Sequence, residues 1–202
     1  MFRLLFVIFF ICTAGCSRNP YLETEVLRMD DVQFWSIVDD SKAGGNDQLD
    51  QAVSLKNSLQ TLTPHEVAQF QSAFEDALNR SYTWDLWGAA YIIRGGCSDD
   101  CFDYFRYWLI AQGEDVFIAA VSNPETLAEF ISKHAVSGVE FEEFYSIGWD
   151  VWCAKTGLDW DDIPKTSYPY ADGPSGEPFA EDPKSLSTRF PILWKHFGDT
   201  PL

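Results

Sequence analysis

The stretch "TLTPHEVAQFQSAFEDALNRSY", residues 61–82, carries the clearest helix signal in the chain. Thr63 stands at an N-cap position, Pro64 at the first helical position, and Glu66 three residues after the cap, which is the order of a capping box. Apolar side chains then recur at the spacing of one helix face: Val67, Phe70, Phe74 and Leu78. This stretch therefore predicts a long amphipathic helix that packs against others.

Capping and breaking residues divide much of the remaining chain into further helices. The expected helices run from Asp30 or Asp31 to about Ala43, over 47–60, from Thr83 or Asp85 to Gly95, from Ser98 to Gly113, over 116–121 and 124–133, and up to Gly157. In the helix over 47–60, four side chains are expected to point inward: Leu49, Val53, Leu55 and Leu59. The sequence shows no useful alternating strand pattern, so it predicts an all-α fold with a single compact multi-helix domain.

The chain after Gly157 has a different character. Five prolines and three glycines fall within 157–183, which predicts an extended connection that packs back on the domain. Pro191 must kink or split the closing helix, because proline lacks the backbone N–H that an inner helical turn needs. The expected organisation is a lipoprotein-like signal at 1–15, a tether at 16–29, a helical domain at 30–157, and a C-terminal extension with a short terminal helix at 158–202.

Charge limits the classes of partner. The chain of 202 residues has a formal net charge of −17, and 16% of its residues are aromatic. An acidic surplus argues against nucleic-acid binding, which needs a basic face, and against docking of the domain on anionic lipid. It permits a basic protein partner, although acidity also serves solubility. The sequence lacks a phosphate-binding GxxxxGK[ST] motif, which argues against a phosphate site, and no cofactor is expected.

The first twenty residues, "MFRLLFVIFFICTAGCSRNP", read as a leader. Arg3 precedes an apolar run that is too short to span a membrane but fits a secretory signal. "TAGC" resembles a bacterial lipobox, in which Cys16 would receive lipid and anchor the protein in the cell envelope, facing the periplasm. The lipid would then be its membrane contact. Translation from Met29 is the alternative, and it would give a cytoplasmic protein without the leader.

The stretch "GGCSDDC", residues 95–101, concentrates chemically active residues and has two interpretations. Ser98 as a helix cap with Asp99 and Asp100 in the first turn accounts for it structurally, because negative charge suits that end of the helix dipole. A site is the other interpretation, in which Asp103 and Arg106 join the two aspartates. The spacing lacks a calcium-loop pattern, and Cys97 with Cys101 would form only half of a zinc site, so no metal is expected.

The stretch "YTWDLWGAAY", residues 82–91, is the second dense patch. Trp84, Trp87 and Tyr91 share a helix face, where aromatic rings grip a ligand or, more commonly, pack in a core. We expect at least one of the two tryptophans to lie mainly in the core. Asp85 and Asp103 are alternative partners for Arg106.

The isolated histidine and cysteine side chains suggest no chemistry of their own. His65, His134 and His196 are scattered and are expected at the surface, and Cys153 is expected to be an inert packing residue. Nothing in the sequence assigns a base to Cys101, although a helix N-terminus lowers the pKa of a thiol. After export, Cys97 and Cys101 would face an oxidising compartment, so a disulfide between them is a conditional prediction.

Three stretches carry a family likeness: "FW" at 34–35, "WDLWGAAYIIRGGCSDDCFDYFRYWLIAQG" at 84–113, and "GEPFAEDPKSLSTRFPILWKHFG" at 176–198. Together they resemble the bacterial family called domain of unknown function 4240, over roughly residues 29–198. The resemblance implies no established activity, so it assigns no catalytic residue. The "TAGC" leader and Cys101 depart from the pattern of that family.

Two functional hypotheses follow from the sequence. The first is a non-enzymatic, acidic helical module that binds an unknown protein partner, for which the net charge permits a basic one. The second is an enzyme of unknown reaction. The candidate cluster, for binding or for chemistry, is Trp84, Asp85, Trp87, Asp99, Asp100, Asp103 and Arg106. A deep pocket lined by this cluster would favour the enzyme, and a flat acidic surface would favour the binding module.

Overall fold

The computed structural model describes residues 26–45, 47–131, 138–164 and 171–198. The helices in these ranges are α1 (Asp31–Ala43), α2 (Gln48–Thr61), α3 (Pro64–Ser81), α4 (Trp84–Arg94), α5 (Asp99–Ala111), α6 (Glu114–Ser122), α7 (Leu127–Phe130), α8 (Glu142–Thr156), α9 (Pro183–Arg189) and α10 (Pro191–Phe197), with short 3-10 turns η1 (Pro124–Thr126) and η3 (Trp160–Asp162). Among the described residues there is no strand, only an isolated bridge between Thr83 and Ser175. The predicted all-α fold is confirmed.

Helix boundaries follow the capping residues. The Thr63 hydroxyl accepts a hydrogen bond from the backbone of Glu66, and the Glu66 carboxylate accepts one from the Thr63 backbone, which completes the predicted capping box. Thr83, and not Asp85, caps α4. α4 and α8 both end at a glycine with a φ of +70°, Gly95 and Gly157, which is a backbone conformation that glycine adopts without strain.

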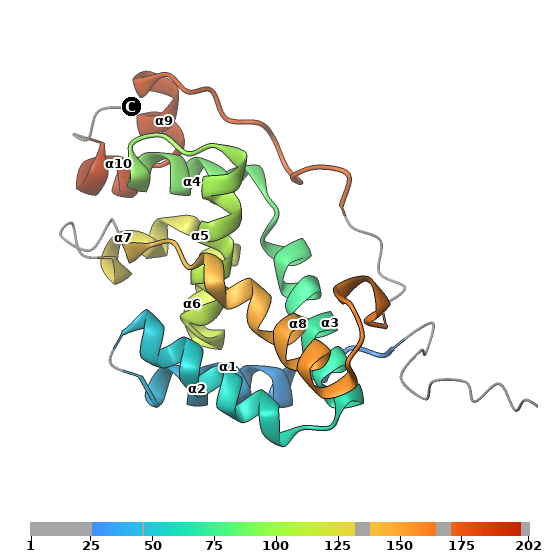
Figure 1. The fold of residues 1–202 in the computed structure, drawn as a ribbon. Coiled ribbons are helices and arrows are strands. Elements are labelled where there is room, and N and C mark those ends of the chain that lie inside the picture. The colour runs from blue at the N-terminus through green and yellow to red at the C-terminus, as the bar shows by residue number, and fades with distance from the viewer. Residues whose placement is uncertain (1–25, 46, 132–137, 165–170, 199–202) are drawn as a thin grey trace, which may run out of the picture.

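The helices are arranged around α3, α5 and α8 (Figure 1). α1 and α2 pack together at one end of the molecule, and α4 lies with α9 and α10 at the other. The inward face of α3 is apolar as predicted, with buried side chains at Val67, Phe70, Phe74 and Leu78. This arrangement leaves one face of α5 beside α8, and that pairing builds the surface described below.

The predicted inward face of α2 is partly wrong. Leu55 and Leu59 are fully buried, but Leu49 is 73% exposed and Val53 is 53% exposed. The third inward position belongs to Gln51, four residues before Leu55, because its amide is hydrogen-bonded inside the protein. The inward face of α2 therefore contains a buried glutamine where apolar side chains were expected.

The chain just before α1 packs on the domain. Val26 and Met29 are buried, and the Met29 N–H donates to the Gln69 carbonyl at 2.9 Å. The last residues of the predicted tether are therefore in contact with α3. The predicted signal segment and Cys16 lie outside the described residues. Within the described part of the chain, no helix has the length and apolar character needed to cross a membrane.

The C-terminal segment packs back on α4, as predicted. Pro191 separates α9 from α10, and both helices bury apolar side chains at Leu186, Phe190, Leu193 and Phe197. The extended chain before α9 is attached at Ser175, whose N–H donates to the Tyr82 carbonyl and whose carbonyl accepts from the Trp84 N–H, both at 2.9 Å. Gly88 of α4 permits the close packing of Phe190 on this helix, because a Cβ there would lie 2.7 Å from the Phe190 ring.

Candidate functional site

The junction between α4 and α5 is held by a tight turn and by its two cysteines. Gly95 and Gly96 have positive φ values of 70° and 115°, which lets the chain reverse between the helices. The structure joins Cys97 and Cys101 as a disulfide, with Cα atoms 5.3 Å apart. The Trp87 indole N–H donates to the Cys97 carbonyl at 3.0 Å, which fixes the turn against α4.

The aromatic side chains of this junction form a stack. Trp84 stacks on Trp87 with ring centroids 5.3 Å apart, and Trp87 stacks on Phe102 at 5.0 Å. The Arg106 guanidinium lies 4.5 Å from the centre of the Tyr82 ring and 5.1 Å from that of Phe102. Both tryptophans are only partly buried, and Trp87 packs against the core. The stack joins α4 to α5.

The charged residues of the predicted cluster do not converge on one point. Arg106 pairs with Asp103 and donates to the Leu78 carbonyl at 3.0 Å, so the alternative partner Asp85 was wrong. Asp85 instead accepts from Arg189 of α9, at 2.9 Å from Nε and 2.7 Å from Nη2. The Asp85–Arg189 pair joins α4 to α9, whereas the Asp103–Arg106 pair lies within α5. The hydrogen bond from Arg106 to the Leu78 carbonyl joins α5 to α3.

Asp99 and Asp100 lie exposed in the first turn of α5, where Ser98 caps the helix through the Cys101 N–H at 3.3 Å. Their position is the one that the capping interpretation predicts. The cluster is therefore divided between an aromatic stack, two separate ion pairs and a solvated helix end.

The isolated histidine and cysteine side chains lie apart from this cluster. His65 is exposed, His196 is partly buried beside Phe197, and His134 lies outside the described residues. Burial raises the pKa of the Cys153 thiol, and nearby aspartates reinforce the effect, so the thiol is held in its unreactive form. No group of three or more His, Cys, Asp or Glu side chains is placed to hold a metal ion in the part of the chain that the structure describes.

A second aromatic feature, which was not predicted from the sequence, crosses from α5 to α8 and η3. We call it the aromatic row, and it consists of Tyr104, Tyr107, Tyr145, Trp149 and Trp160. Successive ring centroids are 6.2, 4.8, 6.4 and 5.9 Å apart. The three tyrosines are partly exposed, Trp160 is 45% exposed, and Trp149 is 9% exposed.

Carboxylates lie beside the aromatic row. The Tyr104 hydroxyl donates to Glu142 at 3.1 Å, and this bond, reinforced by the charges of Asp100 and Asp103, raises the pKa of Tyr104. Burial raises the pKa of Tyr107 well above its usual range, with a further contribution from Asp103. At its α5 end, the row therefore has negatively charged carboxylates beside its exposed rings.

Further acid lies near the α8 end of the row. Cys153 is one helical turn beyond Trp149, and the charges of Asp150, Asp159 and Asp162 act on its thiol. The Trp149 indole N–H is buried without a hydrogen-bond acceptor among the described residues. Sequence spacing alone signals each half of the row, with Tyr104 and Tyr107 three apart on one helix and Tyr145 and Trp149 four apart on another.

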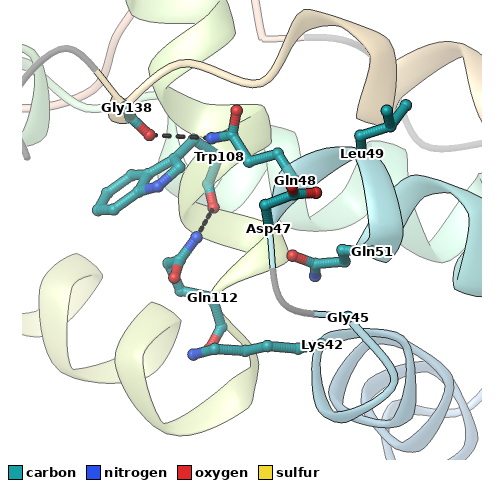
Figure 2. Close-up of a pocket in the computed structure, with 9 residues that line it drawn as sticks. All are labelled: Lys42, Gly45, Asp47, Gln48, Leu49, Gln51, Trp108, Gln112 and Gly138. Carbon is teal, nitrogen blue, oxygen red and sulfur yellow. Dashed lines mark hydrogen bonds between the residues drawn. The ribbon is translucent and has the colours of Figure 1, made fainter.

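A cleft with a volume of about 610 Å³ opens at the opposite end of the molecule from α4 (Figure 2). Its walls come from the α1–α2 connection, the C-terminal end of α5 and Gly138. The lining residues are Lys42, Gly45, Asp47, Gln48, Leu49, Gln51, Trp108, Gln112 and Gly138. None of the residues of the predicted cluster lines this cleft. The prediction that Leu49 points inward missed the cleft, because Leu49 is exposed in its wall and Gln51 is the buried side chain.

Comparison with known proteins gives a family and no activity. The family described as "Protein of unknown function (DUF4240)" matches residues 29–153, which extend from the residue before the α1 cap through most of α8. No curated protein and no solved structure matches the chain. The match includes the α4–α5 junction, the cleft and all of the aromatic row except Trp160, and it ends before the C-terminal helices that the resemblance over 29–198 had included. Because it covers more than half of the sequence, the chain belongs to the DUF4240 family.

Proposed function

We propose that this chain is a non-catalytic protein-binding module whose partner is a basic protein. The observation that carries the proposal is the aromatic row, a series of neighbouring rings that are partly exposed except for the buried Trp149, with carboxylates beside it. Tyrosine and tryptophan are favoured at interfaces, because each rigid ring covers a large area at a small cost in conformational entropy. Carboxylates around such rings favour a partner that presents lysine or arginine.

The molecule contains an internal example of the contact that we propose. Arg106 lies over the rings of Tyr82 and Phe102 while it pairs with Asp103. The rings and the carboxylate both attract the guanidinium, one through its contact with the ring faces and the other through a charged hydrogen bond. Tyr104 with Glu142 presents the same two components at the surface, where an arginine from outside would complete the set.

The overall charge of −17 supports the same partner. Long-range attraction between an acidic and a basic protein accelerates their encounter and makes binding weaken with added salt. The paired Asp85 and Asp103 contribute less to that attraction than unpaired surface carboxylates, because Arg189 and Arg106 offset their charge. The alternative function, an enzyme built on the residues 84–106 cluster, gains no support from contacts that join helices to one another.

The experiment is capture of a partner by the purified chain, with identification by mass spectrometry. Asp100→Asn, Glu142→Gln and Asp150→Asn together remove three charges near the row, and Asp40→Asn, Asp115→Asn and Asp172→Asn remove three exposed charges elsewhere. We expect the wild type and the control triple variant to retain a basic partner that the row variant loses, with capture falling as salt rises. A partner that is retained equally by all three proteins would contradict the proposal.

We also propose that the protein is lipid-anchored at Cys16 in the cell envelope. The support is the leader sequence alone, with its charged start, short apolar run and "TAGC". Intact mass of membrane-extracted protein would test this, and we expect a mature chain that begins at a lipid-modified Cys16. A mass that begins at Met29 without lipid would contradict it and would place the protein in the cytoplasm.

A further inference from the structure

The cleft of Figure 2 has features of a small-ligand site. Its volume of about 610 Å³ lies within the range of roughly 300–1,000 Å³ that is usual for such sites. It lies between α1, α2 and α5, and the predicted cluster contributes no residue to its lining. Its side chains therefore require an explanation separate from the proposed protein-binding surface.

Gln51 is the most informative side chain of the cleft. It is only 6% exposed, and its amide nitrogen donates to the Ala111 carbonyl at 2.7 Å and contacts the Ser41 hydroxyl at 3.4 Å. A main-chain carbonyl can only accept, so the NH₂ group must face Ala111 and the amide oxygen must face the other way. Figure 2 shows that oxygen pointing into the cleft, where no described residue donates to it.

The amide orientations of Gln48 and Gln112 are determined in the same way, by main-chain carbonyls that accept from their NH₂ groups. Gln48 Nε2 donates to the carbonyls of Gly138 at 2.9 Å and Glu140 at 3.0 Å, and Gln112 Nε2 donates to the Trp108 carbonyl at 3.1 Å. Each amide therefore keeps its oxygen as an acceptor for something else. Three neutral acceptors held by the main chain of α5 and of residues 138–140 form a preorganised set of hydrogen-bonding groups.

The charged residues of the cleft balance each other. Lys42 Nζ donates to the Gln112 carbonyl at 2.9 Å and lies over the Phe130 ring, while Asp47 contributes one carboxylate, which caps α2 through the Asp50 N–H. One charge of each sign makes the lining neutral, although the whole chain carries −17. A locally neutral site in a strongly acidic protein favours a neutral ligand, since a charged one would find no net complementary charge there.

We propose that this cleft binds a neutral polyhydroxylated ligand, a mono- or disaccharide. Hydroxyl groups donate to the amide oxygens of Gln48, Gln51 and Gln112, and a hydroxyl oxygen accepts from Lys42. The apolar C–H groups of the sugar ring lie against the walls that Leu49 and Trp108 provide. This site goes beyond the proposed protein-binding function and does not rest on it.

Saturation-transfer NMR tests the proposal on the full chain, with glucose, N-acetylglucosamine, maltose and cellobiose as probes. We expect at least one of the four to receive saturation from the wild type. Gln51→Leu and Gln112→Leu should each weaken its binding about tenfold, as for the loss of one hydrogen bond of about 1.4 kcal/mol. Gln60→Leu, a change of the same kind at an exposed position of α2, should leave binding unchanged.

Three results would overturn the proposal. The first is the absence of transfer to all four sugars. The second is transfer that Gln51→Leu and Gln112→Leu both leave unchanged, which would place the sugar elsewhere; circular dichroism would establish that both variants fold. Transfer to putrescine and to none of the sugars would also overturn it, in favour of a cationic ligand. Partner capture through the aromatic row is measured independently, so failure here leaves that proposal standing.

Discussion

The α4–α5 junction and the aromatic row are both built from aromatic rings and carboxylates, yet they differ in what the carboxylates meet. At the junction, Asp103 and Asp85 pair with Arg106 and Arg189 of the same chain. Along the row, Glu142 meets only the hydroxyl of Tyr104 among the contacts described above. The first arrangement pairs its carboxylates inside the fold, whereas the second leaves the exposed Glu142 carboxylate beside Tyr104, where we propose that a cation of the partner binds.

The largest difference between the two regions should appear in stability. Phe102 is 1% exposed in the junction stack, and Phe102→Ala should cost about 3–5 kcal/mol of unfolding free energy, as for other buried aromatics. Tyr104→Ala, in the partly exposed row, should cost about 1 kcal/mol or less. Denaturant titration of both variants measures this, and equal losses would mean that the row is as structural as the junction.

The pH dependence of stability should reveal the burial of Tyr107 in the row. The folded state raises the pKa of Tyr107 above its usual 10.0, so the fold stabilises the neutral phenol. That stability is complete below pH 10 and is lost as pH rises above 10, where the unfolded chain ionises first. In Tyr107→Phe the decline should be shallower by up to about 1.4 kcal/mol per pH unit. The measurement is the unfolding free energy of the wild type and of Tyr107→Phe across this pH range. If Tyr107 contributes nothing, the two curves will be parallel.

The Asp103–Arg106 and Asp85–Arg189 ion pairs should differ in their contribution to stability. Arg106 is buried, so Asp103→Ala leaves a poorly compensated cation and should cost about 1–3 kcal/mol. Asp85→Ala should cost about 1 kcal/mol or less, because the Asp85 side chain is 57% exposed. Thermal or denaturant unfolding of the two variants compares them. A larger loss for Asp85 would show that its contact with α9 contributes more to stability than the ion pair within α5.

The disulfide should have the smallest effect on stability. The loop that Cys97 and Cys101 close is very short, so its contribution should fall well below the about 3 kcal/mol that chain entropy gives for a 15-residue loop. Thiol alkylation without reduction, followed by peptide mapping, tests whether it forms. If the protein is exported, we expect both cysteines to stay unlabelled, with Cys153 labelled after denaturation as the internal control. Quantitative labelling of Cys97 and Cys101 would rule the disulfide out.

Local features of the fold could be predicted from sequence because their causes are local. The caps at Asp30, Thr63 and Ser98 and the break at Pro191 each depend on residues within one helical turn. The inward face of α2 was misjudged because Gln51 is buried through a hydrogen bond to Ala111, a contact between residues 60 positions apart. The periodicity of apolar residues within one helix carries no information about such a contact, because the partner lies on another helix.

The candidate site was harder to predict for the same reason. Capping correctly placed Asp99 and Asp100, but the partner of Asp85 is Arg189, which lies 104 positions away in the sequence. The aromatic row depends on α5 lying beside α8, which brings Tyr107 and Tyr145 to a centroid distance of 4.8 Å. Neither helix alone shows that its tyrosines have a neighbour, so packing between helices had to be known first.

Amide chemical-shift mapping would show whether a basic partner binds at the aromatic row. Isotope-labelled chain would be titrated with the captured partner. We expect the largest shift changes on residues 100–107, 142–150 and 160–162. These changes should diminish in the variant that combines Asp100→Asn, Glu142→Gln and Asp150→Asn. Shift changes concentrated on α1 and α2, or on α4 and the C-terminal helices, would contradict it.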